Sequence, residues 1–230
     1  NYTNVPEILN ELGIMAVDGI ILDLGVSSHQ ISTAERGFSF DKDGPLDMRM
    51  DKRRTLSAKD LIMNINDKEL RKLLWDYGEE KMASKIARDI VFNKEKINTT
   101  SDLRRVIENI YKNPIDARKT FRRVFQALRI AVNDELGNLV KFLDFMTDLL
   151  KVGGKVAIIS FHSLEDRIVK NKFIQLSGRC VCPSDFPVCV CNIKKKVEIL
   201  TKRVVRPSEE EMQENPMSKS ARMRVCKRIA

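Results

Sequence analysis

A short apolar run at positions 20–22, Ile-Ile-Leu, marks the first predicted element of the sheet. The run is too short for a helix and does not alternate with polar residues, so it predicts a strand buried on both faces, as in a parallel sheet. The strand ends at Asp23, and Gly25, Ser27 and Ser28 follow it. Open α/β sheets bind ligands in the crevice beyond the carboxyl ends of their strands. Asp23 is therefore a candidate for chemistry, although an aspartate here can equally cap the next helix.

A second buried strand is predicted at residues 155–160, directly after a pair of glycines. The preceding segment, 121–150, has apolar residues at helical spacing, with a break near Asn133-Asp134 or Gly137. A helix, a Gly-Gly turn and a strand form the crossover of a doubly wound sheet. His162 follows the strand, so we expect it at the same sheet edge as Asp23. It either takes part in chemistry or makes a structural hydrogen bond at the strand end.

Apolar residues at spacings of three and four predict about four short helices between residues 55 and 113. Ser57 is placed to cap the first helix, and Asn66 with Glu69 has capping-box spacing for the second. The apolar stripes of these helices indicate a core rather than a catalytic site. Two alternating segments, 197–205 and 222–229, predict a final pair of strands.

The segment between the first strand and these helices, residues 31–51, is rich in turn formers and charge. It also carries two phenylalanines and two methionines, which favours an ordered loop over a plain linker. Farther along, Gln126, Arg129 and Asn133 form a polar stripe at helical spacing. This stripe faces either a ligand or another element of the protein.

The chain is basic: Lys and Arg number 41 against 32 Asp and Glu, for a formal net charge of +9 and a pI of 9.3. The surplus is concentrated in residues 104–129, with eight basic and two acidic residues, and in 194–228, with eleven basic and five acidic ones. Such a charge favours a polyanionic partner, RNA or DNA first, although a charged run can also be a solvated face. No run of about 18 apolar residues occurs, so no membrane partner is expected.

Four of the five cysteines crowd into twelve positions, Cys180, Cys182, Cys189 and Cys191. Crowding in a chain of this size argues against a secreted disulfide scaffold and favours a reducing compartment. The two Cys-x-Cys pairs either hold a structural zinc ion or are free thiols, because their spacing is tighter than the usual Cys-x2-Cys. We assign no metal ligand from the sequence. Cys226, in the last strand, is expected to be a core or interface thiol.

Five longer runs closely resemble the ribosomal RNA small subunit methyltransferase H (MraW) family. They are DLGVSSHQ at 23–30, ERGFSF at 35–40, PLDMRMD at 45–51, FQALRIAVNDEL at 125–136 and SFHSLEDR at 160–167. The resemblance implies an α/β fold: the C-terminal portion of a class I (Rossmann-like) methyltransferase sheet, with an inserted all-helical domain. Residues 1–45 and 122–230 are then the methyltransferase domain, and 46–121 the substrate-recognition insert.

The resemblance also implies S-adenosylmethionine-dependent methylation of the N4 amine of a cytidine in small-subunit ribosomal RNA, in the cytoplasm. The partner is that RNA or the assembled small subunit, and a homodimer stays open. The family's cofactor contacts fall on Tyr2, Asp23 and Gln30. Its glycine-rich cofactor loop and ribose-binding acid are expected before Tyr2, so we expect the natural start to lie upstream. The alternative is a non-catalytic, basic RNA-binding or ribosome assembly module; a weaker one makes the cysteine loop a zinc-bearing nucleic-acid contact.

Methylation of a cytosine amine needs an acceptor for its proton, because the amine lone pair is delocalised into the ring. The candidate acceptors are Asp23, a neighbouring backbone carbonyl, Ser27 or Ser28, and His162, and we expect Asp23 to serve both the cofactor and the amine. The target base must be unstacked, and Phe38 and Phe40 either form a stacking wall for it or belong to the core of their own loop. The candidate RNA contacts are those two phenylalanines together with Arg49, Arg118, Arg122, Arg123 and Arg129.

Overall fold

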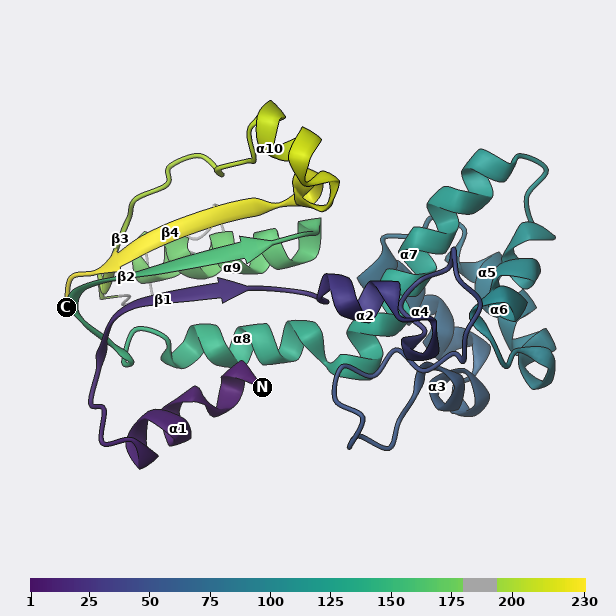
Figure 1. Ribbon diagram of the computed structural model, residues 1–230, viewed down its shortest axis with the longest axis horizontal. Helices are drawn as coiled ribbons and strands as arrows, with labels where there is room; N and C mark the ends of the chain where they lie inside the picture. The colour runs from purple at the N-terminus through teal and green to yellow at the C-terminus, as the bar shows by residue number, and fades with distance from the viewer. Residues whose placement is uncertain (180–193) are drawn as a thin grey trace, which may run out of the picture. The chain divides into compact units, whose positions relative to one another are not determined.

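The computed structural model describes residues 1–179 and 194–230 (Figure 1). The four clustered cysteines lie outside these residues, so the zinc and free-thiol alternatives both stay open. Cys226 is fully buried, and burial raises the pKa of its thiol to about 12. Its predicted place in the core is confirmed. Among the described residues, no helix has the length and apolar character needed to cross a membrane.

The described chain forms two compact units. The sheet unit comprises residues 1–25 and 136–230, and the helical unit comprises residues 26–135. The helical unit is larger than the predicted insert, 46–121, at both ends. On one side the Gly44 carbonyl accepts a hydrogen bond from the Thr100 amide at 2.9 Å, which ties the preceding loop to the helices. On the other, a single helix, α7, continues from Pro114 to Asn133.

Four strands form the sheet in the order β1-β2-β4-β3. Strands β1 (Val17–Asp23) and β2 (Leu150–Ser160) are parallel, as the crossover pattern predicted. Strands β3 (Val197–Ile199) and β4 (Arg222–Arg228) are antiparallel to each other, and β4 is antiparallel to β2. The predicted strand 197–205 is shorter than expected, and beyond β3 only Val205 makes a bridge, to Met223.

Helices α1 (Val5–Glu11), α8 (Glu135–Phe145), α9 (Ser163–Leu176) and α10 (Glu209–Glu214) accompany the sheet (Figure 1). Phe142 of α8 and Phe173 of α9 belong to one buried cluster with Val156 and Ile158 of β2. Both helices therefore pack against the central strands. The candidate site lies at the carboxyl ends of β1 and β2.

Two details of the sheet correct the sequence predictions. Strand β1 is not buried on both faces: Ile21 is 79% exposed, whereas its neighbour Leu22 is 8% exposed. Among the described strands β1 pairs only with β2, so it is an edge strand, and no described element covers the face that carries Ile21. The Gly-Gly pair is not a turn before β2 but lies within it, where the register shifts from Val17–Leu150 to Gly19–Lys155. Gly153 takes φ +89° there, a conformation that favours glycine.

Six α-helices build the described helical unit: α2 (Ser28–Ser32), α3 (Ala58–Asn64), α4 (Asp67–Gly78), α5 (Ala83–Asn93), α6 (Thr100–Glu108) and α7 (Pro114–Asn133). Ser57 and Asn66 cap α3 and α4 in capping boxes, as predicted. The apolar stripes form one core, with Leu70, Ile86, Ile107 and Leu128 fully buried. Asp134, at φ +51°, separates α7 from α8, one of the breaks that the sequence predicted.

Candidate functional site

β1 and β2 are neighbouring parallel strands (Figure 1); Asp23 is the last residue of β1, and His162 lies two residues beyond the end of β2. Asp23 lies in register with Ile159, and the Leu24 amide donates a hydrogen bond to the Ile159 carbonyl at 3.0 Å. Beyond it Gly25 has φ +94°, and the chain passes Phe161 closely enough that an added Cβ would lie 3.8 Å from its ring. The predicted juxtaposition at the carboxyl edge of the sheet is therefore present.

The side chain of Asp23 is exposed to solvent at the end of β1, and the pKa of its carboxyl group is raised. Partial burial and, second, the negative charge of Glu165 raise the pKa of Asp23 above its ordinary value of 3.8. Both causes make the charged form less favourable. Asp23 is therefore a stronger proton acceptor than a free aspartate, which is the property that a general base requires.

Glu165 is a buried carboxylate that our sequence analysis did not select. It is 3% exposed, and its Oε2 accepts hydrogen bonds from the amides of Phe161 at 2.9 Å and His162 at 3.3 Å. In return the Glu165 amide donates to Nδ1 of His162 at 3.5 Å. The signal was present, because His162 and Glu165 have the spacing of a capping box, but histidine is an uncommon cap.

His162 thus has a defined structural role as the cap of α9. Its Nε2 lies 3.2 Å from Oε1 of Glu165 but is not aligned for a hydrogen bond. The structural alternative that the sequence left open is observed. A direct chemical role for His162 stays a prediction.

Ser27, Ser28 and Gln30 belong to the helical unit. The Ser27 hydroxyl accepts a hydrogen bond from the Gln30 amide at 3.2 Å, and the Gln30 side-chain oxygen accepts one from the Ser27 amide at 2.9 Å. These contacts cap α2, whereas Ser28 begins the helix with an exposed side chain. The cap explains why serine and glutamine occupy these positions without a ligand.

The chemistry of the candidate cofactor residues in the sheet unit fits S-adenosylmethionine. Asp23 offers an accessible carboxylate that suits a cationic ligand. Tyr2 offers an aromatic ring, half-buried and held edge-on against Phe142 with ring centroids 5.7 Å apart. An aromatic face fixed in this way suits a planar base. No group of three metal-ligating side chains occurs in residues 1–179 and 194–230.

Phe38 and Phe40 pack against the core of the helical unit. The ring of Phe40 lies 5.6 Å from Phe125 and 6.0 Å from Phe121, and the guanidinium of Arg118 lies 5.7 Å from its centroid. Arg36 lies at the same distance over Phe38. These contacts favour the alternative in which both phenylalanines are part of the loop's own core.

Three of the five candidate RNA-binding arginines are held by carboxylates that are mostly buried. Arg49 forms a bidentate pair with Asp47 at 2.6 and 2.9 Å, and Arg129 forms one with Glu135 at 2.8 and 3.0 Å. Arg123 donates to Glu80 at 2.8 Å, and that carboxylate is almost fully buried. Their charges are therefore largely neutralised within the helical unit.

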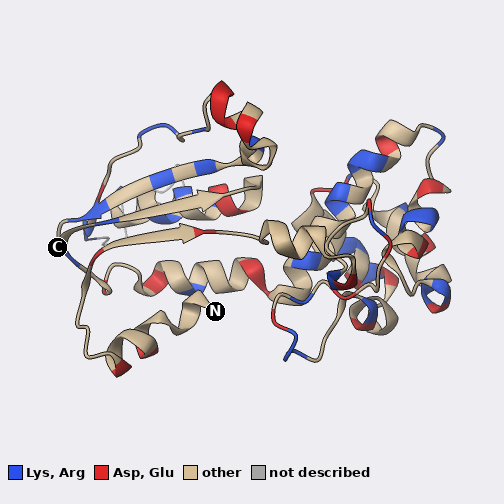
Figure 2. Ribbon diagram, in the orientation of Figure 1, with Lys and Arg blue, Asp and Glu red and all other residues tan. Residues whose placement is uncertain are grey.

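The other two candidates are more accessible. Arg118 contacts Asp41 at 3.2 Å in a pair whose side chains are both more than half exposed. Arg122 is exposed and has no ion-pair partner among the residues that the structure describes. Figure 2 shows that basic residues recur along α7. Arg118 and Arg122 are the better placed of the five to contact an anion.

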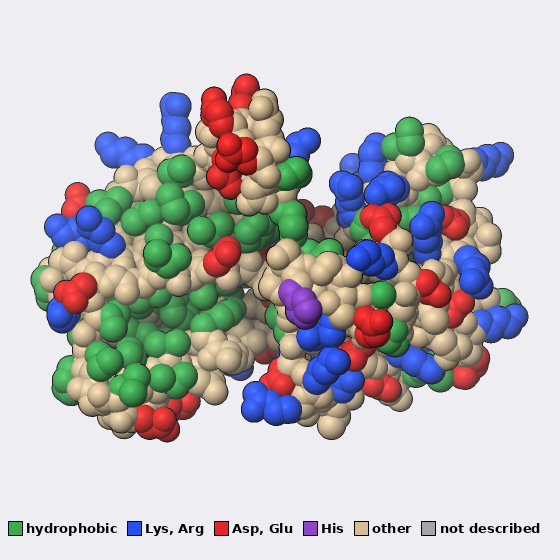
Figure 3. Space-filling model, in the orientation of Figure 1, with side chains coloured by type: hydrophobic (Ala, Val, Ile, Leu, Met, Phe, Trp, Pro, Cys, Tyr) green, Lys and Arg blue, Asp and Glu red, His purple; other side chains and the backbone are tan. Residues whose placement is uncertain are grey.

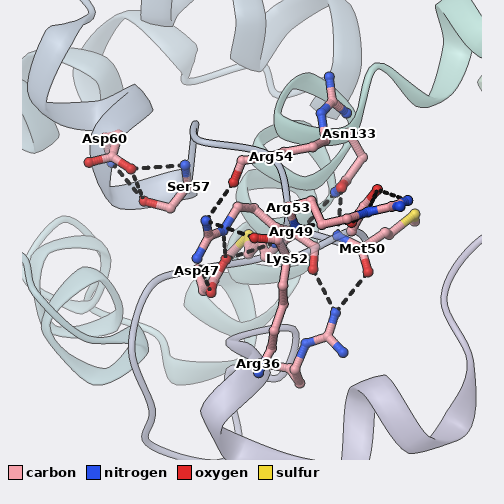
Figure 4. A network of polar contacts seen from close by, with 12 residues as sticks. Arg36, Asp47, Arg49, Met50, Lys52, Arg53, Arg54, Ser57, Asp60 and Asn133 are labelled. Carbon is pink, nitrogen blue, oxygen red and sulfur yellow. Dashed lines mark hydrogen bonds and ion pairs between the residues drawn. The ribbon is translucent and has the colours of Figure 1, made fainter.

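The polar stripe of α7 faces other elements of the helical unit. The Gln126 amide donates to the Tyr77 carbonyl at 2.9 Å, and Asn133 bonds to the backbone of residues 48 and 50 (Figure 4). Of the two predicted alternatives, the contact with another element is observed for each residue of the stripe.

The second basic region that the sequence predicted includes part of a cleft of about 470 Å³ in the sheet unit. Lys195 and Lys202 line it together with Lys170 of α9. Arg224 also lines it but is held by Asp166 at 2.6 and 3.0 Å. The positive charge of this region is therefore partly neutralised.

The chain matches the MraW methylase family over residues 1–229. It is 49% identical to the ribosomal RNA small subunit methyltransferase H of Halothermothrix orenii, over 100% of this chain and 75% of that protein. The proteins of that name from Desulforapulum autotrophicum and Clostridioides difficile are 48% and 44% identical, with the same coverage. The fold, the paired strand ends and these similarities agree with one another: the chain belongs to the MraW methylase family.

Proposed function

We propose that this chain catalyses the S-adenosylmethionine-dependent methylation of a cytidine N4 amine in small-subunit ribosomal RNA. One observation carries the chemical part: Asp23 is accessible at the end of β1, and its pKa is raised. The relatives' name, ribosomal RNA small subunit methyltransferase H, supports the substrate class.

We assign to Asp23 the role of accepting the proton of the amine. The cytosine amine is a poor nucleophile, because its lone pair is delocalised into the ring, and an acceptor that binds its hydrogens favours the nucleophilic form. S-adenosylmethionine, when bound, supplies an activated methyl group, so the protein mainly positions the reactants. A carboxylate with a raised pKa holds the amine hydrogen and takes the proton as the new bond forms.

The remaining candidates have supporting roles in this proposal. His162 and Glu165 fix the turn after β2 beside the end of β1. Ser27 caps α2, so its hydroxyl is already engaged, and Asp23 is the first choice over Ser27, Ser28 and His162. In the helical unit, Arg118 and Arg122 are proposed to contact the RNA phosphates. Such contacts position the substrate without reading its sequence. We place the reaction in the cytoplasm, with the RNA or the assembled small subunit as the partner.

The test is the transfer of labelled methyl from S-adenosylmethionine to small-subunit ribosomal RNA by the wild type and by Asp23→Asn. We expect the variant to lose roughly 10²-fold or more of the rate, the contribution typical of a positioned base. RNA binding should stay unchanged. Asp18→Asn is the matched control, because Asp18 lies at the other end of β1 and pairs with Lys151 at 3.0 Å. A full rate in Asp23→Asn would refute the assigned role, and a wild type that binds RNA but never transfers methyl would favour a binding module.

A further inference from the structure

Side chains of the helical unit form hydrogen bonds with the backbone of the loop of residues 47–54 (Figure 4). Asn133, 4% exposed at the end of α7, donates to the Met48 carbonyl and accepts from the Met50 amide, both at 2.7 Å. Met48 itself has φ +59° and is 1% exposed. A non-glycine residue keeps such a conformation only where its surroundings enforce it. The loop is therefore fixed rather than adaptable.

Two arginines hold further carbonyl groups of this loop. Arg36 donates from Nη2 to the carbonyls of Arg49 at 2.7 Å and Met50 at 3.0 Å. Arg49 donates from Nη1 to the Arg54 carbonyl at 2.6 Å while its other nitrogens bind Asp47. Arg49, which the sequence suggested as an RNA contact, thus braces the loop. The carbonyls of residues 48, 49, 50 and 54 all accept from side chains of the protein itself.

The loop of residues 47–54 exposes three consecutive cationic side chains to solvent, Lys52, Arg53 and Arg54. Arg53 is held by Asp51 at 2.8 and 2.9 Å, and these bonds lower the pKa of Asp51 to about 2, so the carboxylate stays ionised. Lys52 and Arg54 have no side-chain ion-pair partner among the residues that the structure describes. Two uncompensated cations therefore stand on a rigid loop.

We propose that Lys52 and Arg54 form a preorganised contact for the phosphodiester backbone of the RNA substrate. Four carbonyl oxygens that would repel a phosphate are already bonded within the protein. Because the backbone is fixed before binding, the contact does not lose affinity to ordering of the loop. Lysine and arginine are the side chains that neutralise phosphates and release their counterions. The choice of RNA as the partner rests on the proposed function.

The test is the affinity of the full chain for small-subunit ribosomal RNA, measured by fluorescence anisotropy over a series of salt concentrations without cofactor. In the variant Lys52→Ala/Arg54→Ala, the slope of log affinity against log salt should fall in magnitude by about 1.4, the value for two phosphates of a single strand. The matched control is Lys68→Ala/Arg71→Ala, which removes two exposed cations from α4 and should leave the slope unchanged.

A second variant, Asp51→Asn, makes the test independent of any loss of folding. It removes the carboxylate beside the two cations and releases Arg53, so we expect the affinity for the RNA to rise a few-fold. Equal salt slopes for the wild type and the double variant would overturn the proposal, as would an Asp51→Asn affinity no higher than that of the wild type. The readout needs no methyl transfer, so failure of the proposed catalysis would not be mistaken for failure of this contact.

Discussion

The sheet unit and the helical unit use charge in different ways. In the sheet unit, a few titratable groups meet at one edge: Asp23, His162 and Glu165. In the helical unit, cations are numerous, but Arg49, Arg123 and Arg129 are held by carboxylates. Position at a strand end therefore brings a few titratable groups together, whereas the number of cations is a poor measure of a binding surface, because ion pairs within the protein neutralise many of them.

The exposed surfaces of the two units differ as well. Figure 3 shows apolar side chains gathered on the visible face of the sheet unit and charged ones over the helical unit. Met15, Ile21 and Val152 are 94%, 79% and 69% exposed. The helical unit, by contrast, presents exposed cations such as Lys52, Arg54 and Arg122. These differences lead to three further predictions, which start with the largest expected effect.

Asn133→Ala should lower the free energy of unfolding by about 2–4 kcal/mol, because it leaves the buried Met48 carbonyl and the partly buried Met50 amide without their side-chain partner. Urea denaturation followed by circular dichroism measures the change. Asn93→Ala is the control, since that amide donates only to the Asp89 carbonyl within its own helix, and its loss should cost less than about 1 kcal/mol. Equal effects would mean that α7 does not hold the loop of residues 47–54.

Glu165→Gln should shift the acid limb of the methylation rate to lower pH. Asp23 must be ionised to accept a proton, and the negative charge of Glu165 contributes to its raised pKa. Removal of that charge lowers the pKa of Asp23, so the active form persists in more acidic solution. The pH dependence of kcat/KM and the carboxyl chemical shift of Asp23 both report the change.

The control for this prediction is Asp166→Asn, the neighbouring acid, which binds Arg224 at 2.6 and 3.0 Å. Because that carboxylate is already compensated by an arginine, we expect the acid limb to stay in place. An identical limb in the wild type and in Glu165→Gln would show that burial alone sets the proton affinity of Asp23. Asp23 would then titrate without a contribution from the charge of Glu165.

Arg122→Ala should produce the smallest effect, a decrease of about 0.7 in the magnitude of the salt slope for RNA binding, the value for one phosphate of a single strand. Stability should change by no more than about 0.5 kcal/mol, as expected for an exposed side chain without an ion-pair partner. Arg88→Ala, an exposed cation on α5, is the control and should leave the slope unchanged. A slope loss of the same size in both variants would mean that the whole surface of the helical unit attracts RNA, not the side of α7 that carries Arg122.

The sequence by itself determined the features that depend on neighbouring residues. The caps of α3 and α4 at Ser57 and Asn66 follow from hydrogen bonds that span three residues. The ends of β1 and β2, with Asp23 and His162, follow from short apolar runs and the polar residues after them. Glu165 lay within reach of the same reasoning, because its contacts with residues 161 and 162 are local.

Only the tertiary structure decided which charges and surfaces remain available. Arg123 meets Glu80 across 43 positions of the chain, and Asn133 meets Met48 across 85. The open face of β1 likewise depends on which strands and helices pack beside it. The type of a residue tells which groups its side chain is able to bind. The partners that it binds in the folded protein come from distant elements that packing brings together. For that reason the sequence located the sheet edge where Asp23 and His162 lie, but it did not show that Arg49 holds a loop whose neighbouring cations face the solvent.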